Sequence, residues 1–212
     1  MDFFPHILTQ YIEQHSSAED PILAALNRET HLKHLLPQMV SGHQQGLFLE
    51  LASSMLRPKT ILEIGTFTGY SAICLAKGLA PGGKLHTIDI NNELEPITSK
   101  YYALSGMQDR IEQYFGAAAD IIPGLVGDFD LVFIDADKVN YGLYYDLIID
   151  RVPAGGFILV DNVLWSGKVA EAPDSDKDTR ALHAFNQKIA GDSRVTKLIL
   201  SLRDGITLIR KN

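Results

Sequence analysis

Apolar and polar positions follow two different periods along the chain, and the change between them falls near Pro58. Over the first 57 residues the apolar positions have the spacing of amphipathic helices, whereas beyond that point short apolar runs alternate with helical stretches and glycine turns. The pattern predicts helices over 3–15, 20–36, 42–55, 70–79, 94–105, 118–125, 141–151 and 179–190. It predicts strands over 60–64, 84–88, 111–115, 130–134, 157–160, 196–201 and 206–210.

Alternating strands and helices predict an α/β protein with a mostly parallel sheet and helices on both faces. The dipeptide Asp204-Gly205 stands between the last two apolar runs and signals a hairpin, so the last strand should run antiparallel. We therefore expect about seven strands, one of them antiparallel, in a single domain over 1–212. Within it, 58–212 form the α/β core, and 1–57 pack as a helical lid over the carboxyl edge of the sheet, where ligands bind in such folds.

Composition and charge narrow the function classes. The 212 residues carry a net charge of −7, which argues against a nucleic acid or an anionic membrane as the main partner. Cys74 is the single cysteine, so no intramolecular disulfide can form and a reducing compartment fits. The N-terminus lacks the basic region and apolar run of a signal peptide, and no stretch reaches the length of a membrane span. We expect a cytoplasmic protein that acts on small molecules.

Oxygen-bearing side chains follow two of the predicted strands. Asp135 comes directly after the strand 131–134, and Asp161 and Asn162 follow the strand 157–160. The two aspartates are 26 residues apart, which accommodates one crossover and places them on neighbouring parallel strands, roughly 4.8 Å apart. Two carboxylates and an amide oxygen suit a hard divalent cation, although an aspartate-asparagine pair also favours turns and helix caps.

The turn after the first predicted strand has a composition suited to a cofactor. It contains Glu63, Gly65 and Gly69, and it matches neither the dinucleotide fingerprint nor a phosphate-binding P-loop. An acidic residue before the first glycine would repel a pyrophosphate and suits a cofactor with a positive charge. Asp89 ends the next strand, where a carboxylate can accept hydrogen bonds from ribose hydroxyls. The alternative is a glycine turn that only allows close packing.

These motifs together resemble a known family. The turn Glu63–Ser71 resembles motif I of the class I methyltransferases, which use S-adenosylmethionine. The segments 135–141 and 161–167 resemble the cation-dependent caffeoyl-CoA and catechol O-methyltransferase family, and the resemblance covers nearly the whole chain. It implies a Rossmann-like methyltransferase fold, a homodimer, and methyl transfer from S-adenosylmethionine to a hydroxyl of a catechol-type small molecule.

The resemblance also implies roles for individual residues. The implied cofactor contacts are Met39, Ser41, Glu63, Gly65, Thr66, Ser71, Asp89, Ala118 and Asp137. The implied metal ligands are Asp135, Asp161 and Asn162, with Mg²⁺ expected and Mn²⁺ or Ca²⁺ as alternatives. The implied acceptor contacts are Trp165, Lys138 and Tyr141.

Lys138 is the candidate general base, and Asp135 and Lys138 are the candidate catalytic pair. A bound dication would lower the pKa of an acceptor hydroxyl, and it would also favour the neutral amine of a neighbouring lysine. The alternative is that the metal alone acidifies the hydroxyl and Lys138 stabilises the phenolate.

The acceptor is the least determined part of the prediction. The first twenty residues contain no lysine or arginine to bind the phosphates of CoA, and Ser166 replaces an asparagine of the plant enzymes. Both differences favour a small free catechol over a caffeoyl-CoA-like thioester or a flavonoid, which remain alternatives. Other hypotheses are a methyltransferase for a different nucleophile, a nicotinamide dehydrogenase and a non-enzymatic scaffold on this fold.

Overall fold

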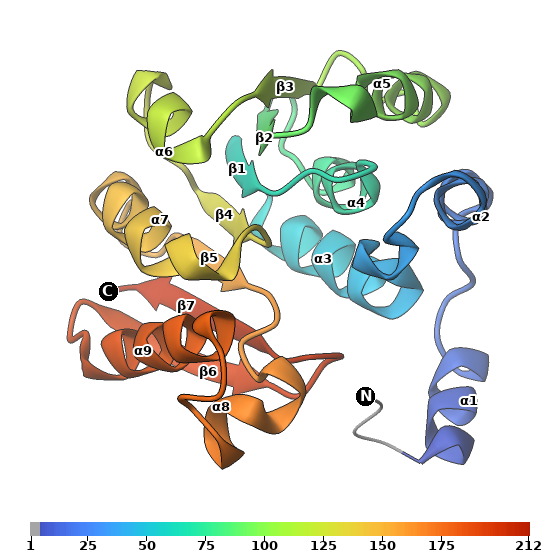
Figure 1. The fold of residues 1–212 in the computed structure, drawn as a ribbon. Helices are drawn as coiled ribbons and strands as arrows, with labels where there is room; N and C mark the ends of the chain where they lie inside the picture. Colours follow the sequence, from blue (N-terminus) through green and yellow to red (C-terminus); the bar gives the residue numbers. More distant parts are fainter. Residues whose placement is uncertain (1–4) are drawn as a thin grey trace.

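A seven-stranded sheet runs through the molecule in the order β3-β2-β1-β4-β5-β7-β6, as a computed structural model describing residues 5–212 shows (Figure 1). The strands are β1 Thr60–Ile64, β2 Lys84–Asp89, β3 Ile111–Phe115, β4 Leu131–Ile134, β5 Phe157–Val160, β6 Val195–Leu200 and β7 Ile206–Lys211. All seven correspond to predicted strands, and no boundary shifts by more than one residue.

The direction of the strands also agrees with the prediction. Strands β1 to β5 pair in parallel, whereas β7 is antiparallel to both of its neighbours, β5 and β6. The turn before β7 depends on Gly205, whose φ is +88° and whose missing Cβ would lie 2.4 Å from Leu164 Cγ. One antiparallel strand in a seven-stranded sheet is therefore a confirmed prediction.

Helices cover both faces of the sheet because its central strands are apolar at consecutive positions, whose side chains point to opposite faces. On β1, Ile61 packs in a core layer with α2, α3, α4 and α5, and its neighbour Leu62 packs in a second layer with α6, α7 and α9. Figure 1 shows α3 and α4 on one side of the sheet and α7 and α9 on the other. The helices are α1 His6–Gln14, α2 Pro21–Lys33, α3 Gly42–Leu56, α4 Tyr70–Lys77, α5 Glu95–Leu104, α6 Ala118–Ile121, α7 Tyr141–Ile148, α8 Lys168–Glu171 and α9 Lys177–Gly191.

Short 3₁₀ segments connect several of these elements: η1 Pro37–Met39, η2 Asn92–Leu94, η3 Ile122–Gly124, η4 Lys138–Asn140, η5 Ile149–Arg151 and η6 Trp165–Gly167. Two differences from the predicted helices stand out. The second helix ends at Lys33 and the chain re-forms a turn only at η1, which starts at Pro37. The segment between the predicted strand 157–160 and the predicted helix 179–190 contains α8 and the start of α9, which Asp176 caps by accepting from the backbone N–H of Thr179.

The N-terminal helices differ in how firmly they are held. Helix α2 packs on α3, α4 and α5, and Leu26 within it is fully buried. Helix α1 has no buried residue, and the start of the predicted helix over 3–15 lies outside the described residues. Within residues 5–212, no helix has the length and apolar character needed to cross a bilayer.

Candidate active site

The predicted site residues meet at the carboxyl edge of the sheet, where β1 and β4 lie side by side. Strand order reverses at this point, because β1 is followed by β2 on one side while β4 and β5 continue on the other. Gly65, with φ +100°, lets the turn after β1 touch the end of β4, since a Cβ at this position would lie 1.9 Å from the backbone oxygen of Asp135. The predicted cofactor turn and the predicted carboxylate cluster are therefore in direct contact.

Asp89 organises the cofactor turn. Its Oδ2 accepts hydrogen bonds from the backbone N–H groups of Thr66, at 3.0 Å, and Phe67, at 2.7 Å, while Oδ1 accepts from that of Asn91. Phe67 needs this support because its φ of 46° is in the left-handed region. Holding the turn is a role that sequence reasoning missed, and the contact of Asp89 with a ribose stays a prediction.

Glu63 is fully buried at the end of β1. Burial is the main cause that raises its pKa to about 8; the charges of Asp135 and Asp89 also raise it, while the hydroxyls of Ser71 and Thr87 act in the opposite direction. Its Oε2 accepts from Thr87 at 2.5 Å, and Thr87 is in turn hydrogen-bonded to Thr66. The other oxygen, Oε1, has no partner among the described residues. A ligand with a positively charged group would supply that partner.

The predicted metal ligands lie at the ends of β4 and β5, which are adjacent and parallel. Asp161 is buried, and its pKa is raised to about 7, first by burial and then by the negative charge of Asp135. Asn162 follows with φ 60°, a left-handed conformation that asparagine tolerates better than most residues. No three His, Cys, Asp or Glu side chains gather as a metal cage within residues 5–212, and Asn162 adds an amide to the two carboxylates at this edge. Two mutually repelling carboxylates fit a divalent cation.

Lys138 points into this cluster. Its Nζ donates to Asp135 Oδ1 at 3.0 Å and to the Tyr141 hydroxyl at 2.7 Å, and its side chain is 11% exposed. The ammonium also lies 5.9 Å from the centre of the Trp165 ring. These contacts hold the Lys138 ammonium in place beside Asp135, whereas a lysine on a solvated loop would make no such contacts.

Tyr141 is fully buried and its hydroxyl has two internal contacts. It accepts from Lys138 and donates to the backbone oxygen of Asp161 at 3.1 Å. Burial raises the pKa of this phenol well above its usual value, so it stays a neutral donor. The contact of Tyr141 with an acceptor stays a prediction, while its role in orienting Lys138 was not anticipated from the sequence.

The loop that follows Asn162 has an unusual backbone. Trp165 and Ser166 both have positive φ, 47° and 55°, which is rare for residues with a side chain. The turn between β6 and β7 holds the loop in place: Asp204 Oδ1 accepts from the Ser166 N–H at 2.5 Å, and its backbone oxygen accepts from Leu164 N–H at 2.9 Å. Such strain persists only where surrounding contacts enforce it.

The remaining predicted cofactor residues have varied surroundings. Ser41, Ser71 and Ala118 are buried, whereas Met39 is 53% exposed. Asp137 is exposed, and its carboxylate accepts from the Tyr144 hydroxyl and the Asn140 amide, both at 2.5 Å. All of these cofactor contacts stay predictions.

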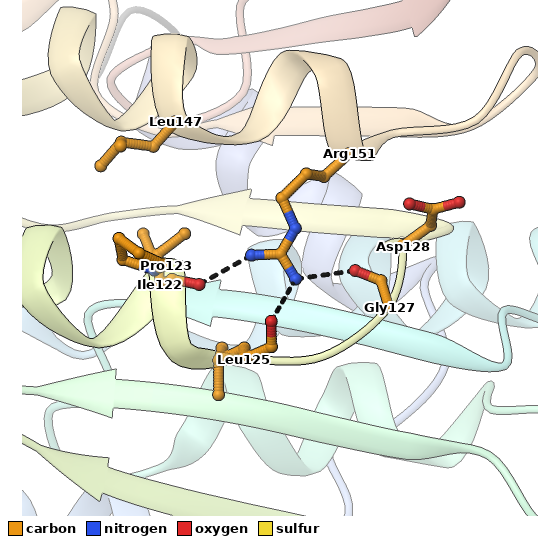
Figure 2. Close-up of a pocket in the computed structure, with 7 residues that line it drawn as sticks. All are labelled: Ile122, Pro123, Leu125, Gly127, Asp128, Leu147 and Arg151. Carbon is orange, nitrogen blue, oxygen red and sulfur yellow. Dashed lines mark hydrogen bonds between the residues drawn. The ribbon is translucent and has the colours of Figure 1, made fainter.

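A separate cavity of about 400 Å³ lies at the opposite end of β4 (Figure 2). Its only cation is Arg151, and Figure 2 shows the guanidinium donating to the backbone oxygens of Ile122, Leu125 and Gly127, each at 2.7 Å. These three carbonyls occupy three of the five guanidinium N–H donors, and the cavity is lined by none of the predicted site residues. It plays no part in the site described above.

Comparison with known proteins defines the class. A family model described as O-methyltransferase matches residues 13–212. Tricin synthase 2 from Oryza sativa subsp. japonica is 37% identical over 191 residues, which are 84% of this chain but only 65% of that protein. Caffeoyl-CoA O-methyltransferase 1 from Eucalyptus globulus is 36% identical over 195 residues, covering 87% of this chain and 79% of that protein.

Solved structures agree with this result. The O-methyltransferase from Bacillus cereus, in complex with SAH, has a TM-score of 0.90 and 28% identity, with 97% of both chains covered. The O-methyltransferase TomG from Streptomyces achromogenes, involved in tomaymycin synthesis and in complex with SAM, has a TM-score of 0.90 and 30% identity, covering 97% of this chain and 96% of that one. The fold and the site thus define an S-adenosylmethionine-dependent O-methyltransferase, as predicted. The chain belongs to the O-methyltransferase family.

Proposed function

We propose that the protein transfers a methyl group from S-adenosylmethionine to one hydroxyl of a small catechol-type molecule, with the help of a divalent cation. The observation that supports this proposal is the contact between the turn at Gly65 and the end of β4 at Asp135. This contact brings the buried carboxylate of Glu63, which suits a cationic cofactor, close to the carboxylates of Asp135 and Asp161, which suit a dication.

Each side chain then has a task that follows from its surroundings. Glu63 Oε1 would accept from the ammonium group at the amino acid end of the cofactor, and Asp89, which keeps the turn in shape through Oδ2, would accept from the ribose through Oδ1. Asp135, Asp161 and Asn162 would hold the cation, Mg²⁺ in our proposal, with Mn²⁺ or Ca²⁺ as alternatives. When bound, the cation supplies charge that orients a vicinal diol and lowers the pKa of its hydroxyl.

Lys138 completes the proposed mechanism. Tyr141 and Asp135 fix its ammonium within the cluster, where the neutral amine would take the proton of the attacking hydroxyl and the charged form would stabilise the phenolate. Methyl transfer is a displacement in line with the leaving sulfur, so holding the acceptor oxygen in position supplies much of the rate. Trp165 lies beside Lys138 and would cover one face of the aromatic acceptor.

The similar proteins suggest a second class of acceptor, a larger molecule, because they include caffeoyl-CoA O-methyltransferases and a tricin synthase. A caffeoyl-CoA-like thioester or a flavonoid carries the same vicinal diol but is larger. The net charge of −7 and the absence of lysine and arginine in the first twenty positions favour the small catechol.

The test is a methyl-transfer assay with S-adenosylmethionine and four acceptors: a free catechol, a monophenol, a flavonoid with a vicinal diol and a caffeoyl-CoA thioester. We expect turnover of the catechol with Mg²⁺ and loss of turnover with a chelator, while calorimetry still detects binding of S-adenosylmethionine and none of NAD. Turnover that is indifferent to the chelator would disprove the metal mechanism. Preference for the thioester or the flavonoid would select the second class of acceptor.

We also propose that the protein is a homodimer. Helix α1 presents Ile7, Leu8, Tyr11 and Ile12 to solvent with exposed fractions from 40% to 73%, and a second chain could cover this face. Light scattering coupled to size exclusion should give twice the chain mass, and Tyr11→Lys should give a monomer. A wild-type monomer at all concentrations would exclude the dimer.

A further inference from the structure

Arg203, in the turn between β6 and β7, connects two distant parts of the chain. Its Nη1 donates to the backbone oxygens of Val40, at 3.1 Å, and Ser41, and to Gln45 Oε1 at 2.9 Å. These partners precede it by about 160 residues and lie in the segment that contains the predicted cofactor contacts Met39 and Ser41. A guanidinium suits this task because its donors have fixed directions and it keeps its charge.

Gln45 extends the connection to the predicted cation site. The side chain is fully buried in α3, and its Nε2 donates to Asp161 Oδ2 at 2.7 Å while Oε1 accepts from Arg203. The orientation of the amide is determined, because the oxygen must face the guanidinium and the nitrogen must face the carboxylate. Two hydrogen bonds therefore join Arg203 to a predicted metal ligand.

The neighbouring residues of the same turn hold the loop after Asn162, which carries the predicted acceptor contact Trp165. Asp204 accepts from the backbone N–H groups of Leu164 and Ser166, and the Gly205 carbonyl accepts from Val163 N–H at 3.1 Å. The turn 203–205 thus touches the 39–41 segment, reaches Asp161 through Gln45, and supports the loop that carries Trp165. No other turn described above meets all three.

We propose that Arg203 is a positioning residue that builds the cofactor site and the cation site together. By holding Val40 and Ser41 with the same nitrogen that orients Gln45, it fixes the position of the 39–41 segment relative to Asp161. The proposal rests on the proposed function, because it needs both sites to exist. It adds a residue outside the predicted site and assigns it an effect on two different ligands.

The test compares three variants by calorimetry with S-adenosylhomocysteine and by electron paramagnetic resonance with Mn²⁺. Arg203→Met removes the guanidinium but keeps the stem, and the exposure of Arg203 allows the variant to fold. We expect the dissociation constants of both ligands to rise about 10-fold, the effect typical of lost supporting contacts, with thermal unfolding close to that of the wild type. Gln45→Met should weaken the binding of Mn²⁺ by a similar factor. It should change the affinity for S-adenosylhomocysteine by no more than about 2-fold, because the contacts of Arg203 with Val40 and Ser41 remain.

Arg210→Met is the matched control. Arg210 is exposed in β7 of the same hairpin, the structure gives its side chain no hydrogen bond or ion pair with the described residues, and both affinities should stay unchanged. The proposal is wrong if Arg203→Met binds both ligands as the wild type does, or if it weakens only one of them. A wild type that binds neither ligand would instead contradict the proposed function, and this proposal with it.

Discussion

Glu63 and Asp161 are both buried carboxylates with a raised pKa, but their surroundings differ in kind. Glu63 receives hydrogen bonds on one oxygen from a hydroxyl, and its other oxygen has no partner among the described residues. Asp161 has donors on both oxygens, Gln45 on one and its neighbour's backbone N–H on the other, and it also faces the charge of Asp135. The first arrangement leaves one position for a cationic group, whereas the second leaves an excess of negative charge for a dication to neutralise.

Burial alone therefore does not define the role of an acid in this site. Glu63 and Asp161 differ in the number of negative charges nearby and in the hydrogen-bond donors that each carboxylate already has. Removing the charge of either residue should therefore affect one ligand and leave the other, and four experiments test this separation.

The largest effect is expected from Asp161→Asn, which keeps the shape of the side chain and removes its charge. Turnover with Mg²⁺ should fall about 1,000-fold, since charge stabilisation by a metal accounts for several kcal/mol. Binding of S-adenosylhomocysteine should stay within about 2-fold by calorimetry, because Asp161 does not face that ligand in our proposal. The metal-free variant should unfold at the wild-type temperature or higher, since a buried repulsion is lost.

Asp174→Asn, at an acid with an 88% exposed side chain, is the control for Asp161→Asn and should change nothing. Full turnover of Asp161→Asn would show that the carboxylate pair holds no catalytic cation.

Lys138→Met should lower turnover about 100-fold, within the range of general acid–base catalysis, and leave the affinity for the cofactor unchanged. If Lys138 is the base, raising the pH should restore part of the rate, because more acceptor is then ionised in solution. If the loss is the same at every pH, Lys138 stabilises the phenolate instead. The control is Lys168→Met, at a lysine with a 52% exposed side chain, and an unchanged rate for Lys138→Met would remove Lys138 from the mechanism.

Glu63→Gln should weaken the binding of S-adenosylmethionine roughly 10- to 100-fold, which corresponds to the free energy of a hydrogen bond to a charged group. Binding a cation favours the ionised carboxylate, so affinity of the wild type should rise as the pH passes the Glu63 pKa of about 8, with release of a proton. Calorimetry in buffers with different ionisation enthalpies measures that proton. Equal pH profiles for the variant and the wild type would contradict the assignment of Glu63 to the cofactor.

The smallest effect concerns stability without ligands. Because folding raises the pKa of Glu63 from 4.5 to about 8, the folded state binds more protons than the unfolded state between these values. The free energy of unfolding should therefore fall as the pH rises through this window, by at most about 1.4 kcal/mol per pH unit for this group. Asp161 contributes with the same sign between 3.8 and about 7.

Urea titrations of the wild type and Glu63→Gln between pH 5 and pH 9 measure the difference. A variant that loses stability as steeply as the wild type would assign the slope to other groups.

The sequence predicted those parts of the site that depend on neighbouring elements. Asp135 and Asp161 end strands joined by one crossover, so their spacing was enough to place them together. The contacts of Arg203 and Gln45 could not be predicted in this way, because each reaches a partner more than 100 residues away through a side chain. Tyr141 was assigned to the acceptor by resemblance, which stays a prediction, and no sequence pattern indicates that its hydroxyl also contacts Lys138 and a backbone carbonyl.

The left-handed backbone at Trp165 and Ser166 has a consequence for protein engineering. A library that varies the acceptor range would naturally target these two positions, but most residues pay a conformational cost at positive φ, and β-branched residues pay most. Libraries restricted to Gly, Asn, Asp and His at Ser166, with aromatic residues at Trp165, should contain a larger share of folded members than fully random ones. In the proposed function, where Trp165 covers the acceptor, the backbone of this loop would thus limit the range of acceptors that single substitutions can introduce.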